Sequence, residues 1–137
     1  MFDILGKEIY FSLMKAYKLK SFTRFARHEN ITDQLLRTAL ADVVEGRAAA
    51  NLGGNVYKVR VTREGAGKRG GFRVLLCLQL GDRAFFLMGF AKSSLENISQ
   101  TDLVALKRQA EILLTLRDEV IAGMLRDGSL EELEVLP

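Results

Sequence analysis

The sequence predicts a single α+β domain built around a mostly antiparallel sheet. The chain has 137 residues, 48% of them apolar, which suits one domain with a substantial hydrophobic core. Segments with the two-residue period of strands alternate with segments that carry the apolar stripe of amphipathic helices. In order, these segments read β-α-α-β-β-β-α, with two helices near the N-terminus and one near the C-terminus. That order is typical of a small α+β fold.

The first third of the chain is expected to hold a short strand and two helices. Residues 18–22 (KLKSF) alternate polar and apolar side chains, as a short edge strand would. Residues 23–28 suit a brief helical turn. Thr32 is a good N-cap for the second helix, and Gly46 suits the position just past its end. The apolar stripe between them consists of Leu36, Ala39, Leu40 and Val43.

The middle of the chain is expected to form the rest of the sheet. Residues 51–54 read as a loop, and residues 64–71 (EGAGKRGG) as a glycine-rich turn. Gly81-Asp82 suits a tight hairpin turn. Between these breaks, strands are predicted over 56–62, 72–80 and 83–91.

The last third is expected to be mainly helical. Ser99 or Thr101 caps a helix whose apolar face repeats at helical spacing. That face consists of Leu103, Leu106, Ala110 and Leu113. A further helical segment over 118–126 stops at Gly128, and the final residues, LEELEVLP, are compatible with an added edge strand.

Positive charge is concentrated in the first half of the chain. Residues 18–73 carry twelve basic and five acidic side chains, whereas residues 74–137 carry six basic and ten acidic ones. Six of the cations, with only Glu64 among them, surround the strand at 56–62 and the glycine-rich turn: Lys58, Arg60, Arg63, Lys68, Arg69 and Arg73. A rigid sheet bearing such cations is suited to a polyanion, most simply an RNA or DNA backbone. Solvated charges on a sheet edge are the alternative interpretation.

Several kinds of site are excluded by residue content. His28 is the only histidine and Cys77 the only cysteine, so we expect no metal site and no thiol catalysis. The RNA-cleaving function considered below also requires no organic cofactor. The GxGK within residues 65–68 lacks Walker spacing and leads into a strand. The apolar runs fall short of the roughly 18 residues that a membrane span requires. We therefore expect a cytoplasmic protein with no membrane association.

A site made only of basic side chains could still cleave RNA. A base must take the proton of the 2′-OH, cations must stabilise the charge that grows on the phosphate, and a donor must protonate the leaving 5′-oxygen. A lysine can act as the base when neighbouring cations lower its pKa, whereas arginine stays charged and grips phosphate with a planar fork. Lys58 and Arg60 share one face of their strand, and an antiparallel partner strand would bring Arg73 to that face.

With these elements placed, residues 14–135 resemble a RelE/HigB-type toxin of bacterial type II toxin–antitoxin systems, in the RelE/ParE superfamily. The motifs that carry the resemblance are ANLGG at 50–54, KxR at 58–60, GxGKxGGFR at 65–73 and a GDRAFF…GFAK hairpin at 81–92. The resemblance implies a RelE/ParE-like fold. It also implies a ribosome-dependent mRNA endonuclease that stops translation until a cognate antitoxin neutralises it.

The resemblance also assigns roles to individual residues. Lys58 and Arg60 match the basic pair that acts on the scissile phosphate, and Arg73 matches the arginine that stabilises transition-state charge. Lys92 matches a further basic residue near the leaving group. Lys68 belongs to the loop that grips the RNA backbone, and Arg69 and Arg63 flank it in the same basic segment. The implied partners are an antitoxin, mRNA and the 30S subunit, with the antitoxin acidic or amphipathic where it covers this face.

The sequence departs from the family pattern in two places, and this leaves alternatives open. Residues 93–98 read SSLENI where the family continues with Asn-Glu-Arg, and no tyrosine follows Tyr57. A gyrase-directed toxin of the same fold and a non-catalytic RNA- or antitoxin-binding protein are the rival functions. Residues 1–13 precede the toxin domain expected over 14–137. They read either as an upstream translation or as a packing segment, and the latter is compatible with a homodimer.

Overall fold

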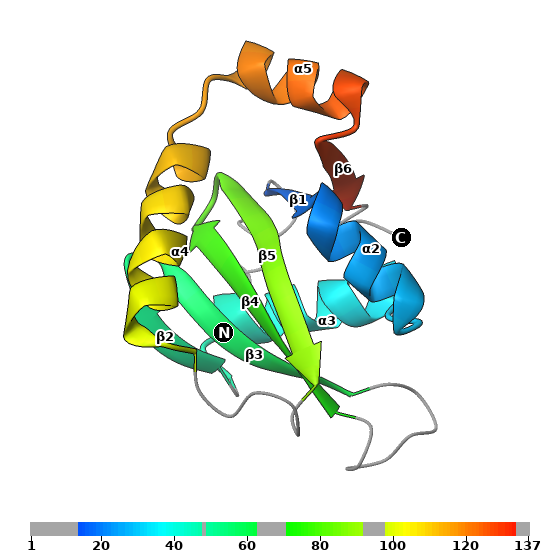
Figure 1. Ribbon diagram of the computed structural model, residues 1–137, viewed down its shortest axis with the longest axis vertical. Coiled ribbons are helices and arrows are strands. Elements are labelled where there is room, and N and C mark those ends of the chain that lie inside the picture. The colour runs from blue at the N-terminus through cyan, green and yellow to red at the C-terminus, as the bar shows by residue number, and fades with distance from the viewer. Residues whose placement is uncertain (1–13, 48, 63–70, 92–97, 134–137) are drawn as a thin grey trace, which may run out of the picture.

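A six-stranded sheet forms the centre of the computed structural model, which describes residues 14–47, 49–62, 71–91 and 98–133 (Figure 1). Along the chain the elements are β1 (Lys15–Leu19), α2 (Lys20–His28), α3 (Asp33–Val44), β2 (Ala49–Gly53), β3 (Val56–Thr62), β4 (Gly71–Gln79), β5 (Arg83–Ala91), α4 (Gln100–Leu114), α5 (Asp118–Asp127) and β6 (Leu130–Leu133). The strand order is β2-β3-β4-β5-β1-β6. Only the β1–β5 pairing is parallel, so the predicted α+β class with a mostly antiparallel sheet is confirmed.

Two apolar clusters, one on each face of the sheet, hold the fold together. On one face α2 and α3 cover alternate residues of β4 such as Val74 and Leu76, while on the other α4 and α5 cover Leu75 and Cys77. Because β4 is covered on both faces, its sequence is a continuous apolar run rather than an alternating one. At Gly89 on β5, an added Cβ would overlap the Phe25 ring, so only glycine allows α2 to pack this closely.

The start of the chain differs from the expectation. The predicted edge strand over 18–22 is wrong, because β1 ends at Leu19 and lies inside the sheet between β5 and β6. The predicted brief turn over 23–28 is the last six residues of the nine-residue helix α2. Phe22, Phe25 and Ala26 have helical spacing, and the Phe22 ring packs 5.4 Å from that of Phe86. Phe22 therefore begins a helical stripe and does not end a strand.

The expected loop over 51–54 is also wrong, because most of it belongs to β2. This strand pairs antiparallel with β3 and contains a register shift between Asn51 and Gly53. The turn that follows is the two-residue Gly54-Asn55, with φ of 61° and 64°. Positive φ at both positions is the pattern of a type I′ hairpin turn. The residues of β2 have low strand propensity, so this strand exists because β3 supplies the hydrogen-bonding partner.

The remaining boundaries follow the local signals closely. Strands β3 and β5 match their predicted ranges, β4 is shifted by one residue, and β6 is the added edge strand at the C-terminal end. The Thr32 hydroxyl accepts a hydrogen bond from the Leu35 N–H at 3.2 Å and caps α3. Ser99, and not Thr101, caps α4 by accepting from the Asp102 N–H at 3.1 Å. Helix α5 ends at Gly128, whose φ is 85°.

Candidate functional site

Three predicted site residues meet on the sheet. In the β3–β4 ladder Arg60 lies directly opposite Arg73, and Lys58 lies two residues before Arg60 on the same strand. Side chains two residues apart on a strand share a face, as do directly opposite residues of paired strands. The expectation that an antiparallel partner would bring Arg73 to the basic face is confirmed. We refer to Lys58, Arg60 and Arg73 as the cation cluster.

The cation cluster lies on the same face of the sheet as α4 and α5. These helices cover neighbouring residues of β3 and β4 on that face. Val56, which precedes it on this face of β3, is fully buried in the cluster of apolar side chains beneath these helices. Val59 and Val61, on the opposite face, are buried against the other helical layer. The cations line an open concavity of about 490 Å³, shared with Ala49 and Ala50 of β2. Ala50 pairs with Lys58, and its small side chain leaves room beside the cations on this face.

No acidic side chain in the described part of the chain forms an ion pair with the cation cluster. Other basic residues do have such partners, as Lys18 has Asp33 and Arg83 has Asp118. In addition, the Arg73 Nη1 is buried and has no hydrogen-bond partner among the described residues. A buried donor without a partner costs about 1–3 kcal/mol. Among the described residues, the cluster is therefore a group of positive charges with no carboxylate to neutralise it.

The other groups considered for chemistry lie apart from this cluster. His28 is exposed and its Nδ1 lies 3.1 Å from Glu29 at the end of α2. Burial raises the pKa of the Cys77 thiol to about 12, so its thiolate is scarce at neutral pH. Within the described ranges, no group of three or more His, Cys, Asp and Glu side chains is arranged to hold a metal. No helix of the described residues is long and apolar enough to cross a membrane.

Four predicted residues, Arg63, Lys68, Arg69 and Lys92, lie outside the described residues, so their positions relative to the cluster stay predictions. The sequence interpretation also missed Lys107 of α4, whose side chain lies against Gly53 and Gly54 at the β2–β3 turn. No local pattern indicated this lysine, because the contact joins residues more than fifty positions apart.

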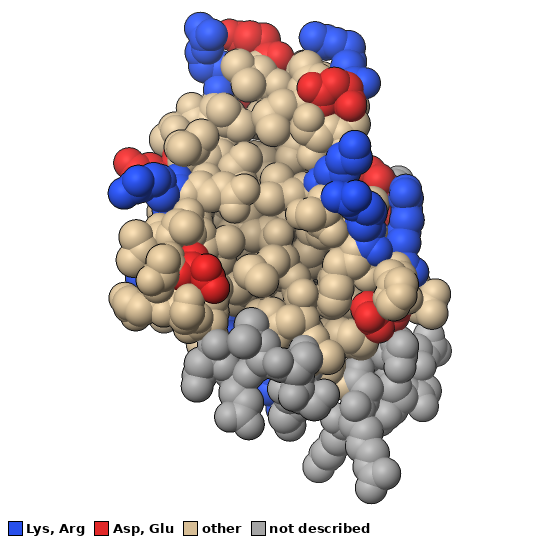
Figure 2. Space-filling view, viewed as in Figure 1, with Lys and Arg blue, Asp and Glu red and all other residues tan. Residues whose placement is uncertain are grey.

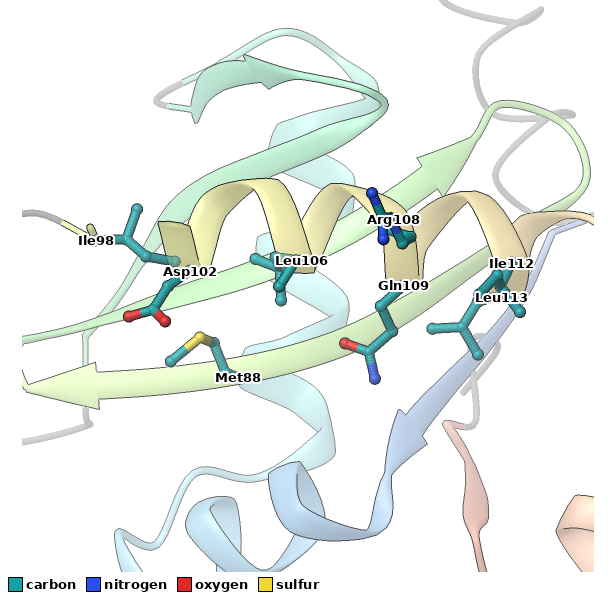
Figure 3. Close-up of a pocket in the computed structure, with 9 residues that line it drawn as sticks. Met88, Ile98, Asp102, Leu106, Arg108, Gln109, Ile112 and Leu113 are labelled. Atoms are coloured by element: carbon teal, nitrogen blue, oxygen red, sulfur yellow. The ribbon is translucent and has the colours of Figure 1, made fainter. Parts of the chain in front are cut away.

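A groove larger than the concavity at the cation cluster is a different kind of site. It lies between α4 and β5, has a volume of about 810 Å³ and is lined by apolar residues including Met88, Leu106 and Ile112 (Figure 3). The surface over β5 and beside α4 carries little charge, and the basic side chains seen from this side project at its margins (Figure 2). An apolar groove does not attract a polyanion, so the smaller concavity at the cation cluster is the better candidate.

The chain is a small α+β protein in which three basic side chains gather on one face of two paired strands. The chain belongs to the RelE family, because residues 14–133 match the family model described as the RelE toxin of the RelE/RelB toxin–antitoxin system. It is thus a toxin of a toxin–antitoxin system, and the family implies an antitoxin as its partner. No curated protein and no solved structure matches the sequence.

Proposed function

We propose that this toxin is an endoribonuclease that cleaves mRNA on the ribosome and is neutralised by a cognate antitoxin. Membership of the RelE family supports this proposal, since toxins of that family are generally endoribonucleases. The structural observation that carries it is the cation cluster, in which three basic side chains share one face of two paired strands without an acidic partner among the described residues. Strands fix the positions of their side chains better than loops do, as transition-state stabilisation requires.

The chemistry assigned to the cluster is cleavage through the RNA's own 2′-OH. The 2′-oxygen attacks phosphorus, the bond from phosphorus to the 5′-oxygen breaks, and the products carry a 2′,3′-cyclic phosphate and a 5′-OH. Of the three residues, only Lys58 can exchange a proton, because arginine remains charged. Lys58 therefore accepts the 2′-OH proton, while Arg60 and Arg73 stabilise the pentacoordinate phosphate.

Residues outside the described ranges complete the proposed site. We assign protonation of the leaving 5′-oxygen to Lys92, and contacts with the RNA backbone to Lys68, Arg69 and Arg63. These assignments rest on the family resemblance and on the position of the segments next to β3, β4 and β5 in the chain. No metal or organic cofactor takes part in the proposed reaction.

The antitoxin is proposed to act by masking the cation cluster. A carboxylate-rich or amphipathic segment laid over Lys58, Arg60 and Arg73 would occupy the site of the phosphate. A structure of the cognate complex checks this directly. Contacts from antitoxin carboxylates to the cluster are expected, and a complex that leaves all three cations open to solvent would contradict the masking model.

The proposed activity is tested by controlled expression in a bacterial host, with primer extension on a highly translated mRNA. Lys58→Ala and Arg73→Ala are compared with Arg24→Ala, which removes a charge from an exposed position of α2. Losing one group that stabilises transition-state charge typically costs about 10²–10³-fold in rate. We therefore expect in-frame, translation-dependent cuts from the unaltered protein and from Arg24→Ala, and almost none from the two site variants.

Two results would overturn the proposal. Growth arrest without any cuts would point to a toxin that acts on a topoisomerase. Absence of both arrest and cuts, with the protein folded and present, would point to a non-catalytic binding protein. The ends of the RNA fragments check the mechanism separately, because a 3′-OH end in place of a cyclic phosphate would exclude attack by the 2′-oxygen.

A further inference from the structure

Lys107 of α4 lies across a pair of glycines at the β2–β3 turn. Its Nζ is 3.1 Å from the position that a Cβ of Gly53 would occupy, and its Cγ and Cδ are 3.2 and 3.3 Å from the corresponding position at Gly54. Side chains at these two residues would therefore crowd the lysine. Both glycines also have positive φ, 86° and 61°, which favours glycine for an independent reason. The stem of Lys107 is packed on the backbone of Gly54, which places its ammonium beside Gly53.

The ammonium of Lys107 forms no ion pair with any carboxylate of the described residues. Glu111 lies one helical turn further along α4 and lines the same concavity of about 480 Å³, which also includes Gly54 and Asn55. A lysine four residues before a glutamate has the less favourable orientation for a helical ion pair. The side chain instead crosses to β2, so its charge is presented at the sheet and is not neutralised on the helix.

The pairing register relates Lys107 to the cation cluster. Gly53 pairs with Val56, and Ala50 pairs with Lys58. The two paired positions are therefore two residues apart along β3. Because a strand rises about 3.3 Å per residue, two residues correspond to about 7 Å along β3. Arg60 lies about the same distance beyond Lys58. Cations are thus spaced along the β2–β3 hairpin, from its turn to the Arg60–Arg73 pair. On this face of β2, Ala50 is small and borders the concavity at the cation cluster, whereas Leu52 packs into the apolar cluster beneath α4 and α5.

We infer that Lys107 is a second phosphate contact on the RNA-binding surface, one that holds the strand being cut at a phosphate next to the scissile one. This inference rests on the proposed function. In it the RNA backbone follows the β2–β3 hairpin, with the scissile phosphate at the cation cluster and the neighbouring phosphate at the glycine turn. Lys107 touches neither reacting oxygen, so it is a positioning residue. It acts on RNA affinity and on KM more than on kcat.

The experiment measures binding of a short single-stranded 2′-O-methyl oligoribonucleotide, which has no 2′-OH and cannot be cut by the proposed reaction. Affinity is followed as a function of salt for the full chain and for Lys107→Met, which keeps most of the packed stem and loses the charge. One phosphate contact with a single strand contributes about 0.7 to the slope of log K against log salt. The slope should therefore fall by about 0.7. The corresponding loss of affinity is about eightfold at roughly 50 mM salt and disappears toward about 1 M.

Three further variants make the result decisive. Lys107→Arg should restore the slope, because it keeps a cation at the turn. Arg24→Ala should leave the slope unchanged, because its charge projects from α2, which covers the opposite face. Lys58→Met should lower the slope by a similar amount. An unchanged slope for Lys107→Met with a lower slope for Lys58→Met would refute the contact while the proposed function stands. Unchanged slopes for both would refute the RNA-binding surface itself.

Discussion

Lys18 of β1 is a buried charge with two carboxylate partners. Replacing the lysine and replacing the carboxylates should change the free energy of unfolding by different amounts. Its side chain is 7% exposed, and its Nζ lies 2.8 Å from Asp33 Oδ1 and 3.4 Å from Glu131 Oε1. The two carboxylates belong to α3 and β6, so the lysine links β1 to a helix and to the edge strand β6. Unlike the lysine, the carboxylates are 40% and 45% exposed. Removing the lysine and removing the acids should therefore have unequal effects on stability.

The magnitudes follow from which charge is left without a partner. In Lys18→Met, the methionine fills the space of the stem and the two half-exposed carboxylates are hydrated, so only weak ion pairs are lost. We expect a decrease of about 1 kcal/mol in the free energy of unfolding. In the Asp33→Asn, Glu131→Gln double variant, the lysine remains buried without a carboxylate. Removing the partner of a buried charge typically costs about 3–5 kcal/mol.

Urea unfolding followed by circular dichroism measures both values, with the free energies extrapolated linearly to water. Asp33 also lies in the first turn of α3, where a negative charge favours the helix by about 0.3–1 kcal/mol. Asp102→Asn in the first turn of α4 measures that contribution alone, because Asp102 forms no ion pair with the described residues. If Lys18→Met destabilises the protein as much as the double variant does, the reasoning from exposure is refuted.

Three further outcomes are expected. Gly89→Ala should lower the free energy of unfolding by about 1–3 kcal/mol through overlap with Phe25, whereas Gly123→Ala in α5 should raise it by up to about 1 kcal/mol; both are read from urea unfolding. Cys77 should react with a thiol reagent only on unfolding. Because its folded pKa of about 12 exceeds the unfolded value of about 9, stability should hold below pH 9 and fall by up to about 1.4 kcal/mol per pH unit above it. A Cys77→Ala variant should lack this component. Ser99→Ala should cost about 1 kcal/mol by removing the α4 cap, and no change in the urea midpoint would contradict it.

Part of the candidate site was predictable because it depends on local geometry. The two-residue period of a strand places Lys58 and Arg60 on one face whatever the rest of the fold is. The glycine-rich segment after this strand favoured an antiparallel return, which set Arg73 opposite Arg60. The absence of ion pairs to the cluster among the described residues was not predictable, since it depends on where acids elsewhere in the chain come to lie.

Local signals in the sequence determined the α+β class, the ranges of β3 and β5, and the ends of the helices at Thr32 and Gly128. Each depends on residue period, a capping side chain or a glycine φ, and these act over a few residues. Only the tertiary structure decided that β2 is a strand, that Lys18 is buried and that Lys107 lies over the glycine turn. These features come from contacts between segments distant in the chain, and a short stretch of sequence does not encode its distant partner.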